Sequence, residues 1–300
     1  NGKRMRRPAL QVPHSVRGLV TRRVLVMDYM DGLTLAQIDE QNRQKRSSKA
    51  NAGEAQSSSS SLDEEAADID AVTKLVGGKL IRALTEGFGQ MVIRGGLFHG
   101  DPHPGNIMVL KNGETALLDF GQTKRLSETL RNQLCELCLL LEQEGEKDYE
   151  SISRVVEEMG VKVVDGADKY VLSACAIWMF DSLSEMPGGY SADELSENSP
   201  VRKIASFPQD LVMVGRSAVL IRGICAFFSI PWSVSRAWVP WAKWRLHGTP
   251  IREPSVIAQR VARVLQFIQL AFAYVSSLVA RNLAKLRPKK VPKFFRYAGA

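Results

Sequence analysis

Three polar residues lie close together in the sequence and have the chemistry of a site for phosphate and a divalent metal ion. The amide Asn106 follows Asp101 by five residues, and a second carboxylate, Asp119, comes after a short apolar stretch. Phosphoryl transfer from ATP needs a carboxylate that faces the acceptor and two oxygen ligands for Mg²⁺, because catalysis depends mainly on positioning and charge neutralisation. These residue types and their spacing therefore predict phosphoryl-transfer chemistry with ATP and Mg²⁺ as cofactors.

The neighbouring residues make the pattern specific. His99, Asp101 and Asn106 keep the spacing H-x-D-x-x-x-x-N, and Asp119 opens an Asp-Phe-Gly tripeptide. Protein kinases place their catalytic aspartate and their metal ligands in the same order. An isolated Asp-Phe-Gly arises by chance in turns, whereas the two motifs together favour a site over a structural hairpin whose aspartates cap turns.

The same stretch indicates the elements that position these residues. Residues 107–110 have the apolar composition of a short buried strand, and residues 115–118 that of a return strand. Residues 111–114 between them carry the Asn-Gly signal of a hairpin turn. Such a hairpin delivers Asp119 at its end, close to Asn106.

Within the loop itself, Pro102 and Pro104 favour extended backbone for the residues that precede them, which stiffens the site. Gly100 stands where many protein kinases have an arginine that pairs with a phosphorylated loop, so we do not expect that switch here. His103 stands where they often have a phosphate-binding lysine. Contact with phosphate and a hydrogen bond that holds the loop remain alternative roles for His103.

The octapeptide at 99–106 resembles the signature of the AarF/UbiB family of atypical kinase-like proteins. Residues 23–32, 94–98 and 214–223 are also similar to stretches of that family, and the resemblance covers about residues 10–245. Members occur in bacteria, mitochondria and plastids and are tied to ubiquinone and other prenylquinone metabolism. The resemblance implies a kinase-like fold and an ATP- and Mg²⁺-dependent activity.

The resemblance also implies residue roles. Asp101 would be the catalytic aspartate, with His99 and His103 beside it in the loop, and Asn106 and Asp119 would bind Mg²⁺.

The nucleotide would meet the chain at a hinge. Met27 would be the gatekeeper, and the backbone of Asp28 and Met30 would contact the adenine. Residues 24–26 would form the strand that leads into this hinge.

A kinase-type site also needs a phosphate-covering loop, a lysine and its glutamate partner, which precede the hinge. The 23 residues before Val24 contain no glycine-rich loop and no acidic residue, and the family's Lys-x-Gly-Gln motif is absent from the sequence. We therefore expect a fragment, or a chain truncated at its start, that holds the C-lobe and the last strands of the N-lobe. A pseudokinase without an N-lobe is the alternative, and ATP binding by this chain alone stays open.

The expected fold class is α+β: a protein-kinase-like fold with a mainly α-helical C-lobe, a hinge strand, the catalytic-loop hairpin and a C-terminal amphipathic or membrane helix. We assign residues 1–40 to the end of the N-lobe and the hinge. Residues 41–69 are polar and serine-rich and predict a disordered insertion. Residues 70–248 form the C-lobe and residues 249–300 a basic tail.

Apolar periodicity and capping signals predict the helices of the C-lobe. Ser127, followed by Glu128, is the expected N-cap of one of them. The expected helices span residues 70–94, 127–144, 148–159, 166–183, 208–228 and 233–246.

The four cysteines show no disulfide-like pattern, which indicates a reducing compartment. Cys135 and Cys138 form a C-x-x-C, but they lie in an apolar helical run. A zinc site needs about two more ligands. We expect both thiols in the core.

The net charge of +8 is unevenly placed, because residues 251–300 hold ten Lys or Arg and one acid and the first 250 residues are near neutral. Residues 264–280 are uncharged and span about 25 Å as a helix, slightly short of a hydrocarbon core. Seven basic residues and several aromatics follow between Arg281 and Tyr297, which suits an anionic membrane surface. A soluble packing helix is the alternative, and nucleic acid is a less favoured partner.

We interpret the sequence as the C-lobe of an atypical kinase or ATPase at an organellar membrane, mitochondrial or plastid, that supports prenylquinone or lipid metabolism. A small-molecule phosphotransferase of the aminoglycoside or choline kinase type is one alternative. A non-catalytic pseudokinase scaffold is another. The segment after Asp119 lacks an Ala-Pro-Glu motif, which argues against a peptide substrate.

Overall fold

The described structure covers residues 10–52 and 76–251 of this computed structural model, apart from residues 144, 146, 182, 194, 195 and 250. They belong to the first of two units, Asn1–Ile251; the second is Arg252–Ala300. The tail helix predicted at 264–280 lies outside the described residues. Within the described part of the chain, no helix has the length and apolarity needed to cross a membrane.

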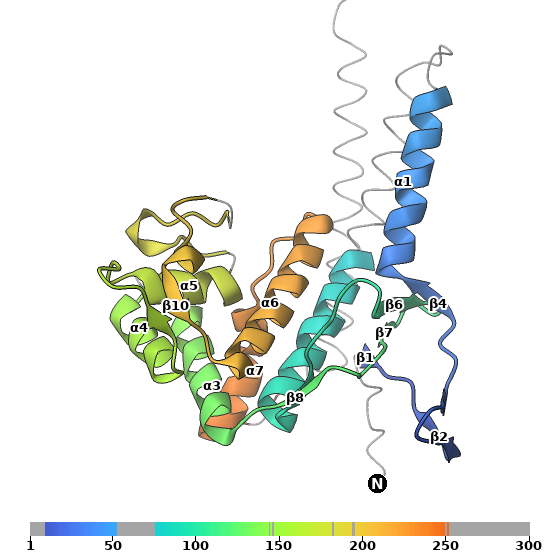
Figure 1. Ribbon diagram of the computed structural model, residues 1–300, viewed down its shortest axis with the longest axis horizontal. Helices are drawn as coiled ribbons and strands as arrows, with labels where there is room; N and C mark the ends of the chain where they lie inside the picture. Colours follow the sequence, from blue (N-terminus) through green and yellow to red (C-terminus); the bar gives the residue numbers. More distant parts are fainter. Residues whose placement is uncertain are drawn as a thin grey trace, which may run out of the picture. The chain divides into compact units, whose positions relative to one another are not determined.

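A four-stranded sheet contains the predicted hairpin and has the strand order β1-β7-β6-β4 (Figure 1). Strand β6 pairs antiparallel with β7, with Met108 opposite Ala116, and this confirms the hairpin. Strand β1 runs parallel to β7, and β4 runs antiparallel to β6. The four strands are β1 (Leu10–Gln11), β4 (Gly32–Thr34), β6 (Ile107–Leu110) and β7 (Thr115–Leu117).

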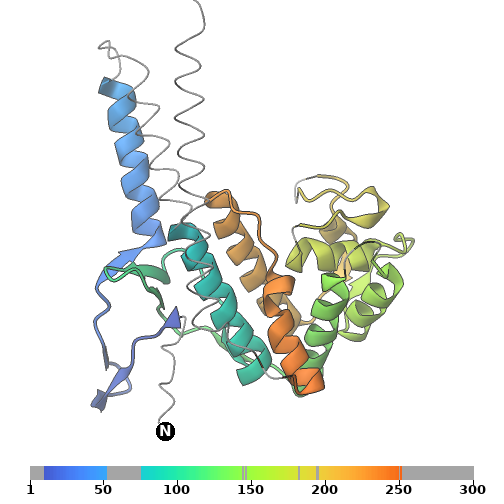
Figure 2. The ribbon, with the colours of Figure 1, turned by 180° about the vertical axis from the view of Figure 1, so that it is seen from behind.

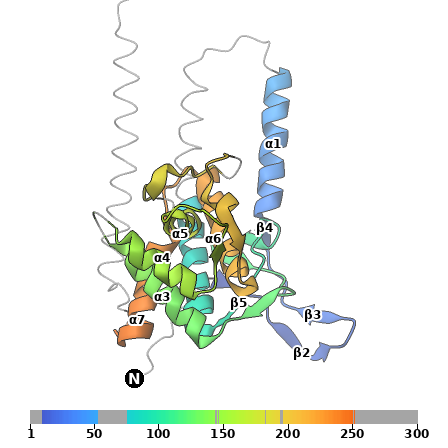
Figure 3. The ribbon, with the colours of Figure 1, turned by 60° about the vertical axis from the view of Figure 1, so that its left-hand side comes forward.

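Three two-stranded ribbons complete the described strands, and Figure 3 labels the strands of the β2–β3 ribbon and strand β5 of another. In each ribbon the strands are antiparallel. The ribbons pair β2 (Ser15–Val20) with β3 (Leu25–Met27), β5 (Leu97–His99) with β8 (Thr123–Arg125), and β9 (Lys162–Val163) with β10 (Ile204–Ser206).

Helix α1 (Leu35–Ala52) extends further than expected. Its last two thirds, residues 41–52, fall in the range 41–69, for which the sequence predicts disorder. Local pairs explain the difference, because Arg43 binds Asp39 at 2.8 Å and the Gln44 amide donates to Glu40 at 2.9 Å. Pairs at this spacing support a solvated helix without burying an apolar face. The rest of that range lies outside the described residues.

The helices of the predicted C-lobe form close to the expected ranges, although the one predicted at 166–183 is shorter and residues 70–75 of the first lie outside the described part of the chain (Figure 2). Residues 76–89 are α-helical and continue into the π-helix η1 (Gln90–Gly95). Ser127 caps the next helix as expected, accepting a hydrogen bond from Leu130 N at 3.2 Å. The others are α3 (Glu128–Glu142), α4 (Tyr149–Glu158), α5 (Val171–Phe180), α6 (Gln209–Phe227) and α7 (Val234–His247), with the 3₁₀ turns Pro187–Gly189 and Pro200–Lys203.

The core lies where these helices meet, and Trp238 of α7 is at its centre. Its side chain is completely buried, and its indole N–H donates to the carbonyl of Thr85 at 3.0 Å. This bond joins α7 to the helix at 76–89, whose Leu84 and Phe88 are also completely buried. That helix leads through η1 to β5, so the core supports the strand that ends at His99.

A buried arginine holds the turn between η1 and β5. The Arg131 guanidinium of α3 donates to the carbonyls of Ile93, at 2.6 and 3.0 Å, and Arg94, at 2.5 Å. Burial lowers the pKa of this guanidinium. Gly96 follows with φ +68°, and a β-carbon there would lie 2.9 Å from an Arg131 nitrogen. The turn thus needs a glycine and an arginine together.

We expect Arg131→Met to lower the free energy of unfolding by roughly 2–3 kcal/mol, because the Ile93 and Arg94 carbonyls lose their donors. Urea denaturation followed by circular dichroism measures the change. The control is Glu128→Gln, since Glu128 is exposed and 3.9 Å from Arg131; we expect a change below about 0.5 kcal/mol. Equal losses in the two variants would contradict this role for the arginine.

Candidate active site

The expected catalytic loop joins β5 to β6 and is held by its own backbone. Asp101 O accepts hydrogen bonds from His103 N at 2.8 Å and from the Asn106 amide at 3.2 Å. Asn106 N donates in turn to His103 O at 2.8 Å. The loop is therefore a closed turn in which Asp101 and Asn106 have fixed places.

His99 ties this loop to the end of the hairpin. Its ring is completely buried, Nδ1 accepts from Asp101 N at 3.1 Å, and Nε2 lies 3.0 Å from the Leu118 carbonyl. Because Nδ1 is an acceptor and the carbonyl needs a donor, the proton is on Nε2. The ring also meets Phe120 edge-on, with centroids 5.0 Å apart. His99 therefore positions the backbone of the site.

Both oxygens of the Asp101 carboxylate have partners. Oδ1 accepts a hydrogen bond from Arg216 Nη2 at 2.8 Å, and Oδ2 accepts from the Gln122 amide at 3.3 Å. Gln122 is fixed by its own carbonyl, which accepts from Gly100 N at 2.7 Å. Neither Arg216 nor Gln122 was among the residues predicted from the motif. Residues 214–223 had shown only a family likeness, without a role for the arginine.

Asn106 and Asp119 meet at one end of the hairpin, as the sequence predicts for the ends of paired strands. Leu118 N donates to Asn106 O at 2.7 Å. Asp119 follows Leu118 in the sequence, and it therefore lies close to Asn106. Asn106 is 8% exposed and its side-chain amide nitrogen donates to Asp101 O, which leaves Oδ1 as the side-chain atom that would bind a cation. Amide and carboxylate oxygens are ligands that Mg²⁺ accepts in proteins.

Asp119 has a backbone conformation that few residues adopt. Its φ is +51°, in the left-handed region, and its Oδ1 accepts from Gly121 N at 3.0 Å. A β-carbon at Gly121 would lie 3.0 Å from the same oxygen, so glycine keeps this turn tight. Non-glycine residues in such conformations cluster at functional sites.

His103 lies on the exposed side of the loop. Its Nδ1 accepts a hydrogen bond from Gly105 N at 3.0 Å. This contact is the loop-holding alternative that the sequence had left open for His103.

The predicted hinge begins at Met27, the last residue of β3, and the chain that follows reaches the far end of the hairpin. Lys111 N, in the hairpin turn, donates to Asp31 O at 3.0 Å, and their side chains form an ion pair at 2.9 Å. Asp28 N donates to His14 O at 3.0 Å. Met27 is 46% exposed. Strand β6 thus connects the predicted hinge region to the predicted metal ligands.

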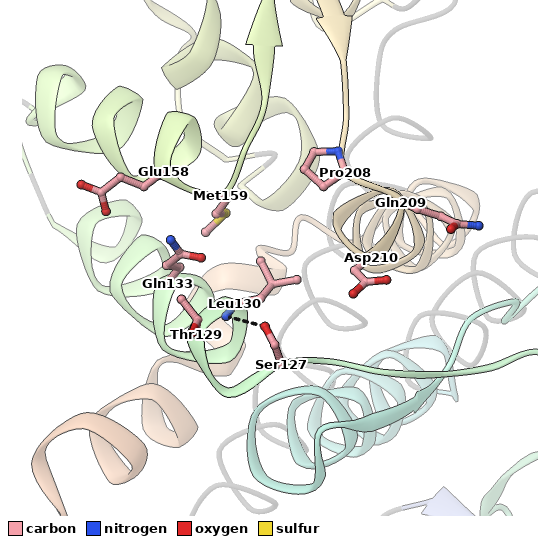
Figure 4. Close-up of a pocket in the computed structure, with 9 residues that line it drawn as sticks. All are labelled: Ser127, Thr129, Leu130, Gln133, Glu158, Met159, Pro208, Gln209 and Asp210. Atoms are coloured by element: carbon pink, nitrogen blue, oxygen red, sulfur yellow. Dashed lines mark hydrogen bonds between the residues drawn. The ribbon is translucent and has the colours of Figure 1, made fainter.

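A surface pocket of about 420 Å³ lies between α3, α4 and the start of α6 (Figure 4). No residue of the described catalytic loop lines it. Its lining residues include Glu158 and Asp210, and Asp210 pairs with Lys124 at 3.0 Å. Because the pocket does not reach the predicted catalytic loop, we do not place the nucleotide in it.

The four cysteines are all buried and free, which fits the core role expected for the C-x-x-C pair. Burial raises the pKa of Cys135 to about 11 and that of Cys138 well above its usual value. It also raises the pKa of Cys175 to about 12 and that of Cys225 to about 11. Among the described residues, no group of three or more His, Cys, Asp or Glu could hold a metal ion.

We predict that the thiols are inert in the folded protein. At pH 8 a thiol with a pKa near 11 is ionised to about one part in a thousand, and the thiolate is the reactive form. A colorimetric thiol reagent should therefore modify none of the four within minutes, and all four in urea. Rapid modification of any thiol in the native protein would contradict its buried position.

We expect His99→Phe to lower the free energy of unfolding by roughly 1–3 kcal/mol for each hydrogen bond lost, since Phe fills the volume but serves neither Asp101 N nor Leu118 O. Thermal and urea unfolding measure the loss. The matched control is His14→Phe, because the His14 side chain is 86% exposed; we expect its stability to change by less than about 0.5 kcal/mol. A stable His99→Phe protein would remove the bridge that we assign to this ring.

Comparison with known proteins gives the family. The family model of the ABC1 atypical kinase-like domain matches residues 3–156. AarF domain-containing protein kinase 1 of Xenopus tropicalis is 28% identical over 233 residues, covering 72% of this chain and 38% of the relative. Protein ACTIVITY OF BC1 COMPLEX KINASE 1, chloroplastic, of Arabidopsis thaliana is 24% identical over 291 residues, covering 93% of this chain and 37% of the relative.

A solved structure of Rv3197 with erythromycin from Mycobacterium tuberculosis overlaps 80% of this chain and 53% of its own, with a TM-score of 0.43 and 17% identity. That likeness carries no conclusion about function. The chain spans less than two fifths of the length of the two curated relatives. Since the family model covers half of its length, the chain belongs to the ABC1 atypical kinase-like family, the AarF/UbiB family that its loop resembles.

Proposed function

We propose that the protein is an atypical kinase or ATPase that uses Mg²⁺ and ATP, with Asp101 as its catalytic carboxylate. The observation that carries the proposal is the meeting of Asp101, Asn106 and Asp119 around one end of the β6–β7 hairpin. Bound Mg²⁺ would neutralise phosphate charge during transfer. Asn106 Oδ1 and the carboxylate of Asp119 are the protein ligands that we assign to it.

Asp101 would orient the acceptor and take its proton through Oδ2. Its backbone is fixed by His99 and Asn106, so the carboxylate needs little rearrangement before reaction. Groups held in this way contribute to catalysis because the reacting geometry exists beforehand. His103 is exposed and stabilises the loop by accepting the hydrogen bond from Gly105 N.

The nucleotide would extend along the hairpin. The Asp28 carbonyl and the backbone of Met30 would meet the adenine, with Met27 beside them. The four residues of β6 separate that end from Asn106, a distance of about 13 Å at the usual rise of a strand. This distance is the reason for placing the adenine at one end of β6 and the phosphates at the other.

A small acceptor, or water, is the class that we propose. Only residues 120–127 lie between Asp119 and the first residue of α3, and three of them form β8, which pairs with β5. So short a segment gives little surface for an extended peptide. It favours ATP hydrolysis or transfer to a small molecule, including the aminoglycoside or choline kinase type of acceptor.

The cellular setting is part of the proposal. Relatives named as chloroplastic support an organellar location, plastid or mitochondrion. A role in prenylquinone or lipid metabolism rests on the family resemblance. An anionic membrane surface rests on the sequence of residues 264–300, outside the described part of the chain.

The test is made on the full-length protein with and without ATP, Mg²⁺ and EDTA. We expect ATP with Mg²⁺ to raise the unfolding temperature and ATP to be turned over. Asp101→Asn should keep the thermal shift and lower turnover by roughly 100-fold or more. Asp119→Asn should abolish the part of the shift that depends on Mg²⁺.

Asp165→Asn is the matched control, because this exposed aspartate lies in the turn after β9. It should behave as the parent protein does. Turnover that is unchanged in Asp119→Asn would remove this residue from the metal site. A parent protein without any shift from ATP and Mg²⁺ would contradict the enzyme proposal and favour a scaffold.

A further inference from the structure

A cation from a distant part of the chain contacts the proposed catalytic carboxylate. Arg216 Nη2 of α6 lies 2.8 Å from Asp101 Oδ1, although the two residues are 115 apart in the sequence. The Asp101 side chain is 13% exposed and that of Arg216 is 50% exposed. Bonds between guanidinium and carboxylate are short, strong and directional, so this one fixes the orientation of the Asp101 side chain.

Helix α6 is well placed to hold Arg216 still. Its buried face includes Leu211, Val214 and Ile221, which lie in the core. Asp210 in its first turn pairs with Lys124 of β8 at 3.0 Å. A side chain that stands on an anchored helix is more exactly positioned than one on a free loop.

The same helix touches the loop directly beside Asp101. Ser217 Oγ lies 3.4 Å from His99 O, within reach of a weak hydrogen bond. A β-carbon on Gly100 would come within 2.5 Å of the Met213 side chain, so glycine lets the loop approach α6 closely. Arg216 lies between Met213 and Ser217, on the stretch of helix that faces the loop.

We propose that Arg216 is the positioning residue for Asp101 in the phosphoryl transfer proposed above, on which this inference rests. Arg216 holds Oδ1 and thereby turns Oδ2 toward the acceptor. The contact of Oδ2 with the Gln122 amide is longer, at 3.3 Å, and carries no charge on the donor. An acceptor hydroxyl or a water molecule therefore displaces Gln122, while Arg216 stays bound.

This role differs from two others that an arginine near a phosphate site can have. A merely exposed ion pair contributes little to stability or activity. An arginine that binds the nucleotide itself changes the KM for ATP. A residue that works through Asp101 changes kcat, and its removal has no effect once Asp101 has lost its charge.

The experiment measures kcat and KM for ATP in the full-length protein carrying Arg216→Met, Arg216→Gln or Arg216→Lys. For Met and Gln we expect kcat to fall roughly 10- to 100-fold, the loss typical of a reacting group misplaced by about 1 Å, with KM within about twofold. Arg216→Lys should restore kcat to within about fivefold of the parent, since one charged donor suffices for the single contact. Unfolding temperatures show which variants are folded. If Arg216→Met does not fold, Arg216→Gln is the variant used, because a glutamine side chain suits a half-exposed position.

A double variant separates action through Asp101 from independent action. In an Asp101→Asn background, Arg216→Met should cause no further loss of kcat, because residues that act as a unit are not additive. Lys162→Met is the control, since Lys162 is an exposed cation on β9 and should leave both constants unchanged.

Provided that the parent protein is active, three results would overturn the inference alone. The first is an unchanged kcat in both Arg216→Met and Arg216→Gln, and the second is a raised KM for ATP in these variants at constant kcat. The third is a loss of kcat from Arg216→Met that is as large in the Asp101→Asn background as in the parent protein. A parent protein that turns over no ATP would instead contradict the proposed function, and this inference with it.

Discussion

The buried ring of His99 is the contact on which the arrangement of the site depends. It bridges the loop that carries Asp101 and the strand end that carries Asp119, through Asp101 N and the Leu118 carbonyl. Together with Asn106, which bonds to Asp101 O and to Leu118 N, this ring sets the spacing between the proposed catalytic carboxylate and the proposed metal ligands. Because the ring is completely buried, loss of either bond leaves a polar group that water cannot easily serve.

Around this bridge, two sets of contacts support the site. The helix at 76–89 and α7 support β5 through the core and the Trp238 indole. Helix α6 contacts the loop itself and contributes Arg216. Arg216 holds Asp101 Oδ1, and Oδ2, which we propose takes the proton, contacts only the neutral amide of Gln122 among the bonds described. The carboxylate thus has a fixed orientation, and a substrate can reach Oδ2 by displacing the amide.

The sequence predicted what depends on local signals. The Asn-Gly turn fixed the hairpin, the Ser127 cap fixed the start of α3, and apolar periodicity located the C-lobe helices. Helix α5 is shorter than the predicted 166–183, because its first residues form a turn in which Tyr170 N donates to Asp168. Polar side-chain pairs, which a search for buried faces does not weigh, extended α1 beyond residue 40. The bond between Arg216 and Asp101 joins residues 115 apart, and no local pattern encodes it.

The π-helix at Gln90–Gly95 takes up one residue between the core and the site. A π-helical turn contains an extra residue relative to an α-helical turn, so the wide turn accommodates that residue locally. Deletion of one residue here would restore α-helical winding and leave the direction of the chain from Gly96 to His99 nearly unchanged. The length of this segment can therefore change by one residue without displacing the strand that ends at His99.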